Sequence, residues 1–110
     1  MNISRLFFLF SRLSYMTKLN KLYKYSNPEE VNRRAMQLHL NEIHPSSRAN
    51  KKYMVFNGHN MVHFGAYPNY EDYTKHHNEK RRDNFNKRNH KWANAPVYSP
   101  AWLSYWLLWN

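Results

Sequence analysis

The chain has 110 residues, a formal net charge of +10 and no cysteine. This length fits one domain, and the lack of cysteine excludes disulfide bonds and thiolate metal sites. Nine Tyr, six Phe and four Trp can supply a small core, because each large aromatic side chain buries about 150–250 Å².

The positive charge is unevenly distributed along the chain. Residues 1–27 carry five cations and no acidic residue, whereas residues 93–110 carry no charged side chain. A basic front and a neutral, aromatic tail indicate an anionic partner for one surface and burial of the other end. The alternative is that the lysines only keep a small protein soluble.

The first sixteen residues are acid-free and amphipathic, with Arg5 and Arg12 on one side. Three interpretations stay open: a mitochondrial transit peptide, a surface helix on an anionic membrane, or a poorly ordered extension. The continuous apolar run is too short to cross a bilayer, which requires about 20 residues. We therefore expect residues 1–26 to be a basic amphipathic or disordered extension and residues 27–110 to be a compact module.

The next segment begins with the residues of a helix start. Asn27 can cap a helix, and Pro28 suits its first turn. We predict a helix from Pro28 to about Ile43, ended by Pro45, and a loop through residues 44–50.

Two short apolar runs, Lys52–Phe56 and Met61–Phe64, follow around an Asn57-Gly58 pair. Asn-Gly between apolar runs predicts a β-hairpin. Both faces of the hairpin are apolar, so we expect it to be covered on both sides. Helices must pack on it, since two strands alone are marginally stable in water.

The last third of the chain predicts two helices. The first runs from Tyr70 to about Lys91, with a break near residues 74–77. Ser99 and Pro100 open a final short helix with its tryptophans along one side. The predicted fold is a small single α+β domain in which an N-terminal helix, a basic central helix and a short aromatic C-terminal helix pack on one β-hairpin.

The basic helix is the strongest candidate site, because cations along one backbone can contact successive phosphates. Interleaved Tyr and Trp could stack on unpaired bases. The alternative is a solvated helix whose arginines stack on aromatic side chains or contact another protein chain. The predicted nucleic-acid or partner-binding residues are Lys75, Lys80, Arg81, Arg82, Lys87, Arg88 and Lys91.

Histidine-based chemistry has weaker support. A metal site would require His63, Asp72 and His76 to be brought together by folding, and their spacing does not demand this. The order His59, Asn69, His77 weakly resembles ββα-metal nucleases, but no carboxylate-rich surround is visible. We therefore predict no catalytic residues, no metal site and no cofactor.

Several separated blocks carry a family resemblance. They are KKY at 51–53, HFG at 63–65, YEDYTKH at 70–76, the Arg81-Arg82 pair, and YSPAWLSYWLLWN at 98–110. In this order they resemble a family of small basic proteins encoded by nucleocytoplasmic large DNA viruses, over about residues 28–110. The motif positions are interpreted as structural: a turn at Gly65, a cap or turn at Asp72 and Thr74, and an Asp72–Arg81 ion pair. The full structural set is Tyr53, His63, Phe64, Gly65, Asp72, Tyr73, Thr74, His76 and Trp109.

The resemblance implies a non-enzymatic structural or architectural protein, located in the virion or the infected host cell and contacting other virion proteins. The alternative is a module that binds DNA or RNA through the basic helix, and a metal-dependent nuclease ranks third. An anionic membrane surface is a further candidate partner for the N-terminal segment, and no small-molecule substrate is expected.

Overall fold

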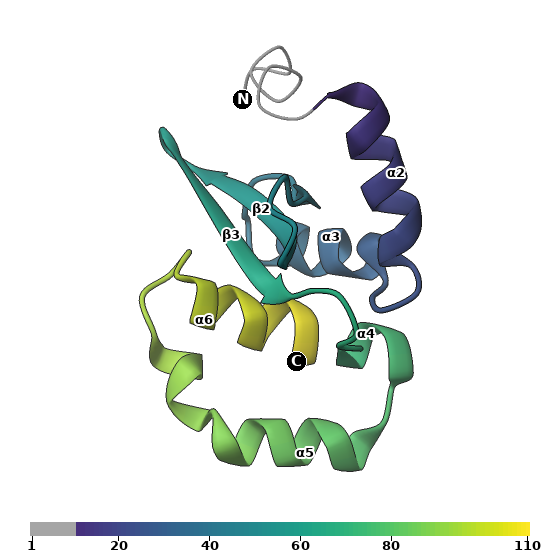
Figure 1. Cartoon of the computed structure of the whole chain (residues 1–110). Helices are drawn as coiled ribbons and strands as arrows, with labels where there is room; N and C mark the ends of the chain where they lie inside the picture. The colour runs from purple at the N-terminus through teal and green to yellow at the C-terminus, as the bar shows by residue number, and fades with distance from the viewer. Residues whose placement is uncertain (1–10) are drawn as a thin grey trace.

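A computed structural model describes residues 11–110 as a three-stranded antiparallel sheet surrounded by helices (Figure 1). The sheet order is β1-β2-β3, so β2 lies in the middle. This arrangement confirms the predicted α+β class. The strands are β1 (His44–Pro45), β2 (Lys51–Asn57) and β3 (Asn60–Ala66), and the helices are α2 (Arg12–Leu22), α3 (Pro28–Gln37), α4 (Tyr73–His76), α5 (Glu79–Arg88), the 3₁₀-helix η1 (His90–Asn94), α6 (Pro100–Leu103) and the π-helix η2 (Ser104–Trp109).

The predicted hairpin is present as β2 and β3, joined by a two-residue turn. Asn57 pairs with Asn60, which leaves Gly58 and His59 as the central residues. Gly58 has a φ of +63°, as the first central position of a type II′ turn requires. The sharp turn therefore depends on the glycine, and Asn57 belongs to the strand.

The helix predicted from Pro28 to Ile43 is shorter than expected, and this prediction was wrong at its C-terminal end. Helix α3 ends at Gln37, after which His39 takes a left-handed conformation with φ +59°. The chain then continues as β1, which pairs with β2. The side-chain amide of Asn32 donates to the carbonyl of Ile43 and accepts from its N–H, at 3.1 and 2.9 Å. A side chain of α3 thus forms hydrogen bonds with the extended backbone beside β1. The local sequence does not predict this contact.

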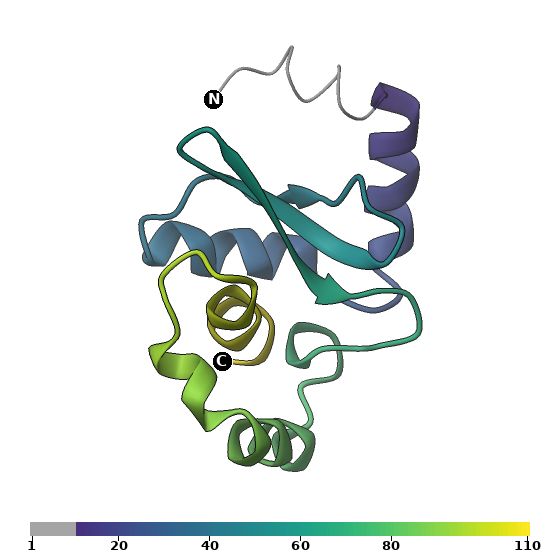
Figure 2. The same ribbon diagram turned by 60° about the vertical axis from the view of Figure 1, so that its left-hand side comes forward.

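The core lies between the sheet, α3 and the C-terminal helix, which is the continuous segment formed by α6 and η2. Figure 2 shows the C-terminal helix end-on, between α3 and α5. The buried side chains of this core are Leu22, Val31, Ala35, Ile43, Tyr53, Val55, Phe64, Leu103, Leu107 and Leu108. The tail therefore uses leucines for its fully buried side, while Trp102 and Trp109 pack only partly buried against it.

Both faces of β2 are covered, as its apolar pattern predicted. Tyr53 and Val55 belong to the main core, while Met54 and Phe56 form a second buried cluster with Met61. Every residue from Lys52 to Phe56 is buried. The central strand is thus buried on both faces.

The predicted break in the basic helix is confirmed, but the predicted start at Tyr70 was wrong, because the first helical residue is Tyr73. Asp72 caps α4, His77 ends it with a φ of +51°, and Asn78 caps α5 by accepting from the backbone N–H of Arg81. The left-handed residue separates the two helices, and α5 runs along the bottom of the molecule in Figure 1.

Residues 11–26, placed by the sequence in an extension, contact the module. Leu22 at the end of α2 is fully buried in the core. The ammonium of Lys18 donates to the backbone carbonyls of Ser46, Arg48 and Lys51, at 2.9–3.2 Å. The predicted boundary at residue 26 therefore does not coincide with a gap in the packing, and residues 1–10 lie outside the described residues. Within 11–110, no helix is long and apolar enough to cross a bilayer.

Candidate functional site

A cleft of about 770 Å³ lies between the open end of the hairpin, α5 and the C-terminal helix. We call it the α5 cleft and define it by Lys51, Gly65, Tyr70, Arg88 and Trp92, with further residues named below where they matter. It joins segments that are far apart in the chain, from Lys51 to Trp109. Its volume falls in the range of about 300–1,000 Å³ that is usual for ligand pockets.

The floor of the cleft is apolar and closely packed. Gly65 has a φ of +83°, and a Cβ there would lie 3.0 Å from Leu108 Cδ1 and 3.1 Å from Lys52 Cβ. Phe85 and Trp109 also line the cleft, with parallel rings whose centroids are 4.3 Å apart. Backbone conformation and space therefore both require glycine here, but the predicted turn at Gly65 was wrong, because the residue lies within β3.

A buried ion pair joins the floor of the cleft to the start of α4. Lys52 Nζ lies 3.0 Å from Asp72 Oδ2, and the two side chains are only 2% and 1% exposed. Burial lowers the pKa of Lys52, and the carboxylate of Asp72 opposes this shift. Asp72 also accepts from the backbone N–H of Thr74 at 3.0 Å and from its hydroxyl. The expected cap by Asp72 and Thr74 is present, but the expected Asp72–Arg81 ion pair was wrong.

Thr74 continues this polar network toward α3. Its hydroxyl lies 3.2 Å from Ser26 Oγ and accepts from the backbone N–H of Asn27 at 2.9 Å. Tyr53 donates to Ser26 at 2.7 Å, and burial raises the pKa of its phenol. Buried polar groups are costly unless they are hydrogen-bonded, so these contacts fix the position of α4 over the sheet.

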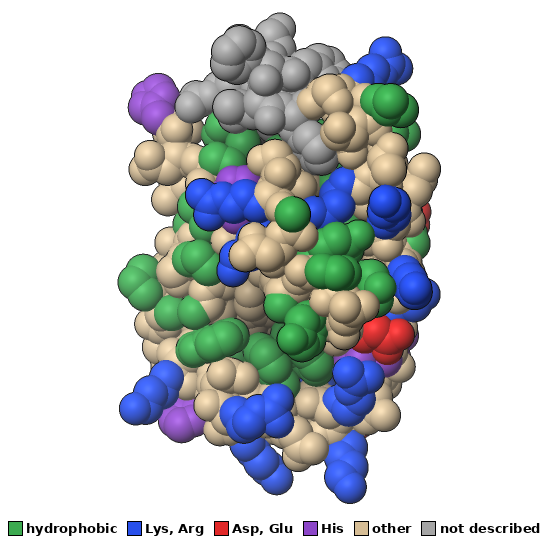
Figure 3. Space-filling view, viewed as in Figure 1, with side chains coloured by type: hydrophobic (Ala, Val, Ile, Leu, Met, Phe, Trp, Pro, Cys, Tyr) green, Lys and Arg blue, Asp and Glu red, His purple; other side chains and the backbone are tan. Residues whose placement is uncertain are grey.

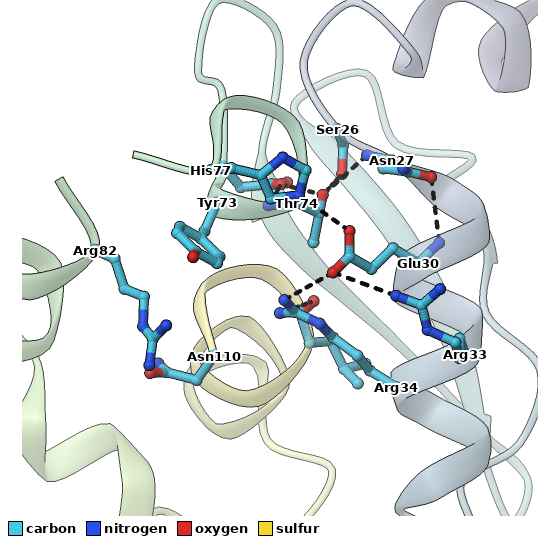
Figure 4. A network of polar contacts seen from close by, with 12 residues as sticks. Ser26, Asn27, Glu30, Arg33, Arg34, Tyr73, Thr74, His77, Arg82 and Asn110 are labelled. Atoms are coloured by element: carbon cyan, nitrogen blue, oxygen red, sulfur yellow. Dashed lines mark hydrogen bonds and ion pairs between the residues drawn. The ribbon is translucent and has the colours of Figure 1, made fainter. Parts of the chain in front are cut away.

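Glu30 forms the second half of the network shown in Figure 4, where α3, the end of η2 and the loop after α4 meet. Its carboxylate lies 3.1 Å from Arg34, 3.5 Å from Arg33 and 3.3 Å from His77. Arg34 also donates to the carbonyl of Leu107 at 3.2 Å. Arg34 thus holds the tail in place and is engaged within the fold, unlike the exposed cations of α5.

The cations predicted to bind a partner are mostly exposed. The exposed members are Lys75, Lys80, Arg81, Lys87, Arg88 and Lys91. Arg81 and Arg88 line the cleft, and Arg81 lies 3.6 Å from Glu71 in a half-exposed pair.

Arg82 differs from the other predicted cations. Its guanidinium lies over the Tyr73 ring at 5.1 Å and 3.5 Å from Glu79. Figure 4 shows it extending toward Asn110. Tyr73, one of the structural motif residues, also donates a short hydrogen bond to Glu79. Arg82 is therefore engaged within the fold, as the stacking alternative anticipated for arginines of this helix.

Aromatic side chains complete the cleft. Tyr70 is 63% exposed and Trp92 is 36% exposed, and both line the cleft. The Trp92 ring packs edge-on against Phe85, with centroids 5.7 Å apart. Figure 3 shows hydrophobic side chains gathered on one face, with Lys and Arg side chains above and below them.

The predicted binding set contained neither Lys51 nor these two aromatic residues. The spacing of three or four between Tyr70, Tyr73, His77, Arg81, Phe85, Arg88 and Trp92 was the available signal. It could not reveal that Lys51, some 20–40 residues away, faces the same cleft.

The histidines are engaged in separate contacts. His63 Nδ1 lies 2.7 Å from Ser46 Oγ in the loop before β2, so the histidine anchors that loop. His76 accepts from the backbone N–H of Asn78 at 2.9 Å and packs against Trp109. Burial lowers the pKa of both imidazoles. Among residues 11–110 no three His, Asp or Glu side chains gather closely enough to hold a metal ion.

A family model described as a family of unknown function (DUF5754) matches residues 41–89. The matched segment runs from just before β1 to just past α5, and so includes Arg81 and Arg88 but neither Trp92 nor the C-terminal helix. No curated protein and no solved structure matches the chain.

Proposed function

We propose that this protein is a non-enzymatic nucleic-acid-binding module of a large DNA virus, acting in the virion or the infected host cell. The observation that supports this proposal best is the surplus of exposed cations on α5 and just after it. Between Glu79 and Lys91 there are six cations and two acidic residues, and Arg82 is the only one of the six that is not exposed.

Exposed cations along one helix suit contact with a phosphate backbone, because each neutralised phosphate releases condensed counterions. Lys80, Lys87 and Lys91 extend outward, while Arg81 and Arg88 border the cleft. The resemblance to small basic viral proteins gives such a module a role in organising the packaged genome.

The test is a salt titration of binding to a fluorescein-labelled oligonucleotide. If three or four phosphates are contacted, log Kobs should fall with log[salt] at a slope of about −2 to −4. A Lys87→Glu/Arg88→Glu variant should lose about tenfold or more in affinity at about 0.1 M salt and show a shallower slope. Both residues are exposed, so the fold should tolerate the change.

The matched control is Arg12→Glu/Lys21→Glu, which alters net charge equally. Both residues are exposed on α2, at the other end of the molecule from α5 (Figure 1). The control should change affinity by less than about twofold at the same salt concentration, because screening limits charge effects to about 10 Å at 0.1 M salt. Equal losses in the two variants would mean that only net charge matters, and would refute a site on α5.

A second candidate is a structural virion protein whose cleft face binds another virion protein. The exposed aromatics Tyr70 and Trp92 beside Arg88 favour this alternative, because aromatic residues and Arg are enriched at protein interfaces. This candidate predicts stoichiometric presence in purified particles by mass spectrometry, together with weak affinity for free nucleic acid at every salt concentration.

A further inference from the structure

We infer that the α5 cleft receives an unpaired nucleobase, so that the module recognises single-stranded nucleic acid in preference to duplex. This inference rests on the proposed function, and it specifies the class of nucleic acid that is bound and the residues that would contact its bases. Phosphate contact alone needs only a charged surface, whereas the α5 cleft is a shaped, partly apolar cavity.

The cleft combines the two features that single-strand binding requires. Lys51, Arg81 and Arg88 bring positive charge from two sides of the cavity, against Glu71 as the one acidic residue among those that line it. Glu71 is already paired with Arg81. The remaining positive charge suits a phosphate on either side of an inserted base.

The aromatic residues supply the second feature. Tyr70 and Trp92 remain substantially exposed although they line a cavity, which leaves ring surface available for stacking. Stacking is tolerant of sequence, because every base has a π-face. In the stacked Phe85–Trp109 pair, the two facing ring surfaces are closed to a ligand, since each covers the other.

The base of the cavity is held rigid before any ligand arrives. The Lys52–Asp72 ion pair and the close contact of Gly65 with Leu108 lie directly beneath it. Such preorganisation limits the ordering cost of binding. A base in a duplex is paired and stacked on its neighbours, so it could not enter without being extruded.

Three probes of equal length separate the contributions of phosphate and base: a (dT)12 strand, a twelve-unit strand of the same phosphates carrying abasic sites, and a twelve-base-pair duplex. Fluorescence anisotropy at one fixed salt concentration gives each Kd. We expect (dT)12 to bind at least about fivefold more tightly than the abasic strand, because stacking one base contributes a factor of about 5 to 150. The duplex should bind more weakly than (dT)12.

Tyr70→Ala and Trp92→Ala should each weaken (dT)12 binding by about fivefold or more and leave abasic-strand binding unchanged. Tyr70 is so exposed that its loss should not disturb the fold, and Trp92→Phe, which keeps an aromatic ring, should retain most of the affinity. The control is Tyr23→Ala, an exposed tyrosine on the α2–α3 side that does not line the cleft.

The outcomes distinguish this inference from the function on which it rests. Equal binding of (dT)12 and the abasic strand, with no effect of Tyr70→Ala, would overturn the base-binding inference and leave phosphate contact through α5 intact. Failure of all three probes to bind at low salt would overturn both. Tighter binding of the duplex than of (dT)12 would also refute the inference.

Discussion

The buried Lys52–Asp72 ion pair gives the sharpest prediction about stability. Asp72→Asn keeps the size of the side chain and an oxygen that can accept from the Thr74 backbone N–H, but removes the negative charge. The ammonium of Lys52, 2% exposed, then has no counter-charge. Breaking a buried ion pair from one side costs about 3–5 kcal/mol.

That cost is large for this chain. At about 0.05–0.15 kcal/mol per residue, a domain of this length has a free energy of unfolding of about 5–16 kcal/mol. At roughly 4 °C per kcal/mol, Asp72→Asn should lower Tm by about 12–20 °C. Lys52→Met, which keeps the aliphatic stem packed against Gly65, should also destabilise, because it leaves the Asp72 carboxylate buried without its cation.

The double variant Lys52→Met/Asp72→Asn should recover most of the loss, since a buried ion pair can often be replaced by neutral side chains of similar volume. Chemical denaturation of the four proteins gives a coupling free energy, which is the sum of the two single losses minus the loss in the double variant. It should be about 4 kcal/mol or more if each single variant loses about 3–5 kcal/mol. The same cycle at the half-exposed Arg81–Glu71 pair, with Arg81→Met and Glu71→Gln, is the control and should give less than about 1 kcal/mol. Additive effects at Lys52 and Asp72 would refute the reasoning.

Three further outcomes follow from the packing. Gly65→Ala should destabilise the protein by about 2 kcal/mol or more, because the positive φ and the 3.0 Å approach to Leu108 act together. At Gly58 the added Cβ meets open space, so Gly58→Ala should cost only the backbone strain of about 1–2 kcal/mol. Equal losses of the two variants in urea denaturation would contradict this reasoning. Burial lowers the pKa of His63, so as pH falls below about 6.5 the unfolded state takes up a proton first and stability decreases. His63→Gln should flatten this decrease when Tm is measured as a function of pH. An unchanged profile would show that His63 does not cause the decrease. Lys18→Met should raise amide hydrogen exchange throughout α2, because the variant loses three hydrogen bonds to backbone carbonyls, and unchanged protection would show that the apolar contacts suffice.

Features that depend on one residue and its near neighbours in sequence, such as the capped starts of two helices and the hairpin turn, were predicted correctly. Asn27 and Ser99 each accept from a backbone N–H three residues ahead, and a cap of this kind is visible in a few letters of sequence. Gly58 marked the hairpin for the same reason, since the turn depends on one residue's φ. The start of α3, the hairpin and the start of the last helix could therefore be predicted.

Contacts between distant segments could not be predicted in this way. The two-residue strand β1 exists because Asn32 and β2 satisfy the backbone around it. The partner of Asp72 is Lys52, twenty residues earlier, because the start of α4 lies against the hairpin. Nearness in sequence suggested Arg81 instead, and only the tertiary structure decided between the two cations.

The candidate site also has features that the sequence determines and features that only the tertiary structure determines. Composition alone established a basic central helix and an uncharged tail, because charge and hydropathy are properties of the residues themselves. Which cations face outward is a property of packing: Arg82 stacks on Tyr73, while Arg88 borders a cavity shared with Lys51 and Trp92. A cavity is the space left between elements that fold together, so it has no counterpart in the order of residues along the chain.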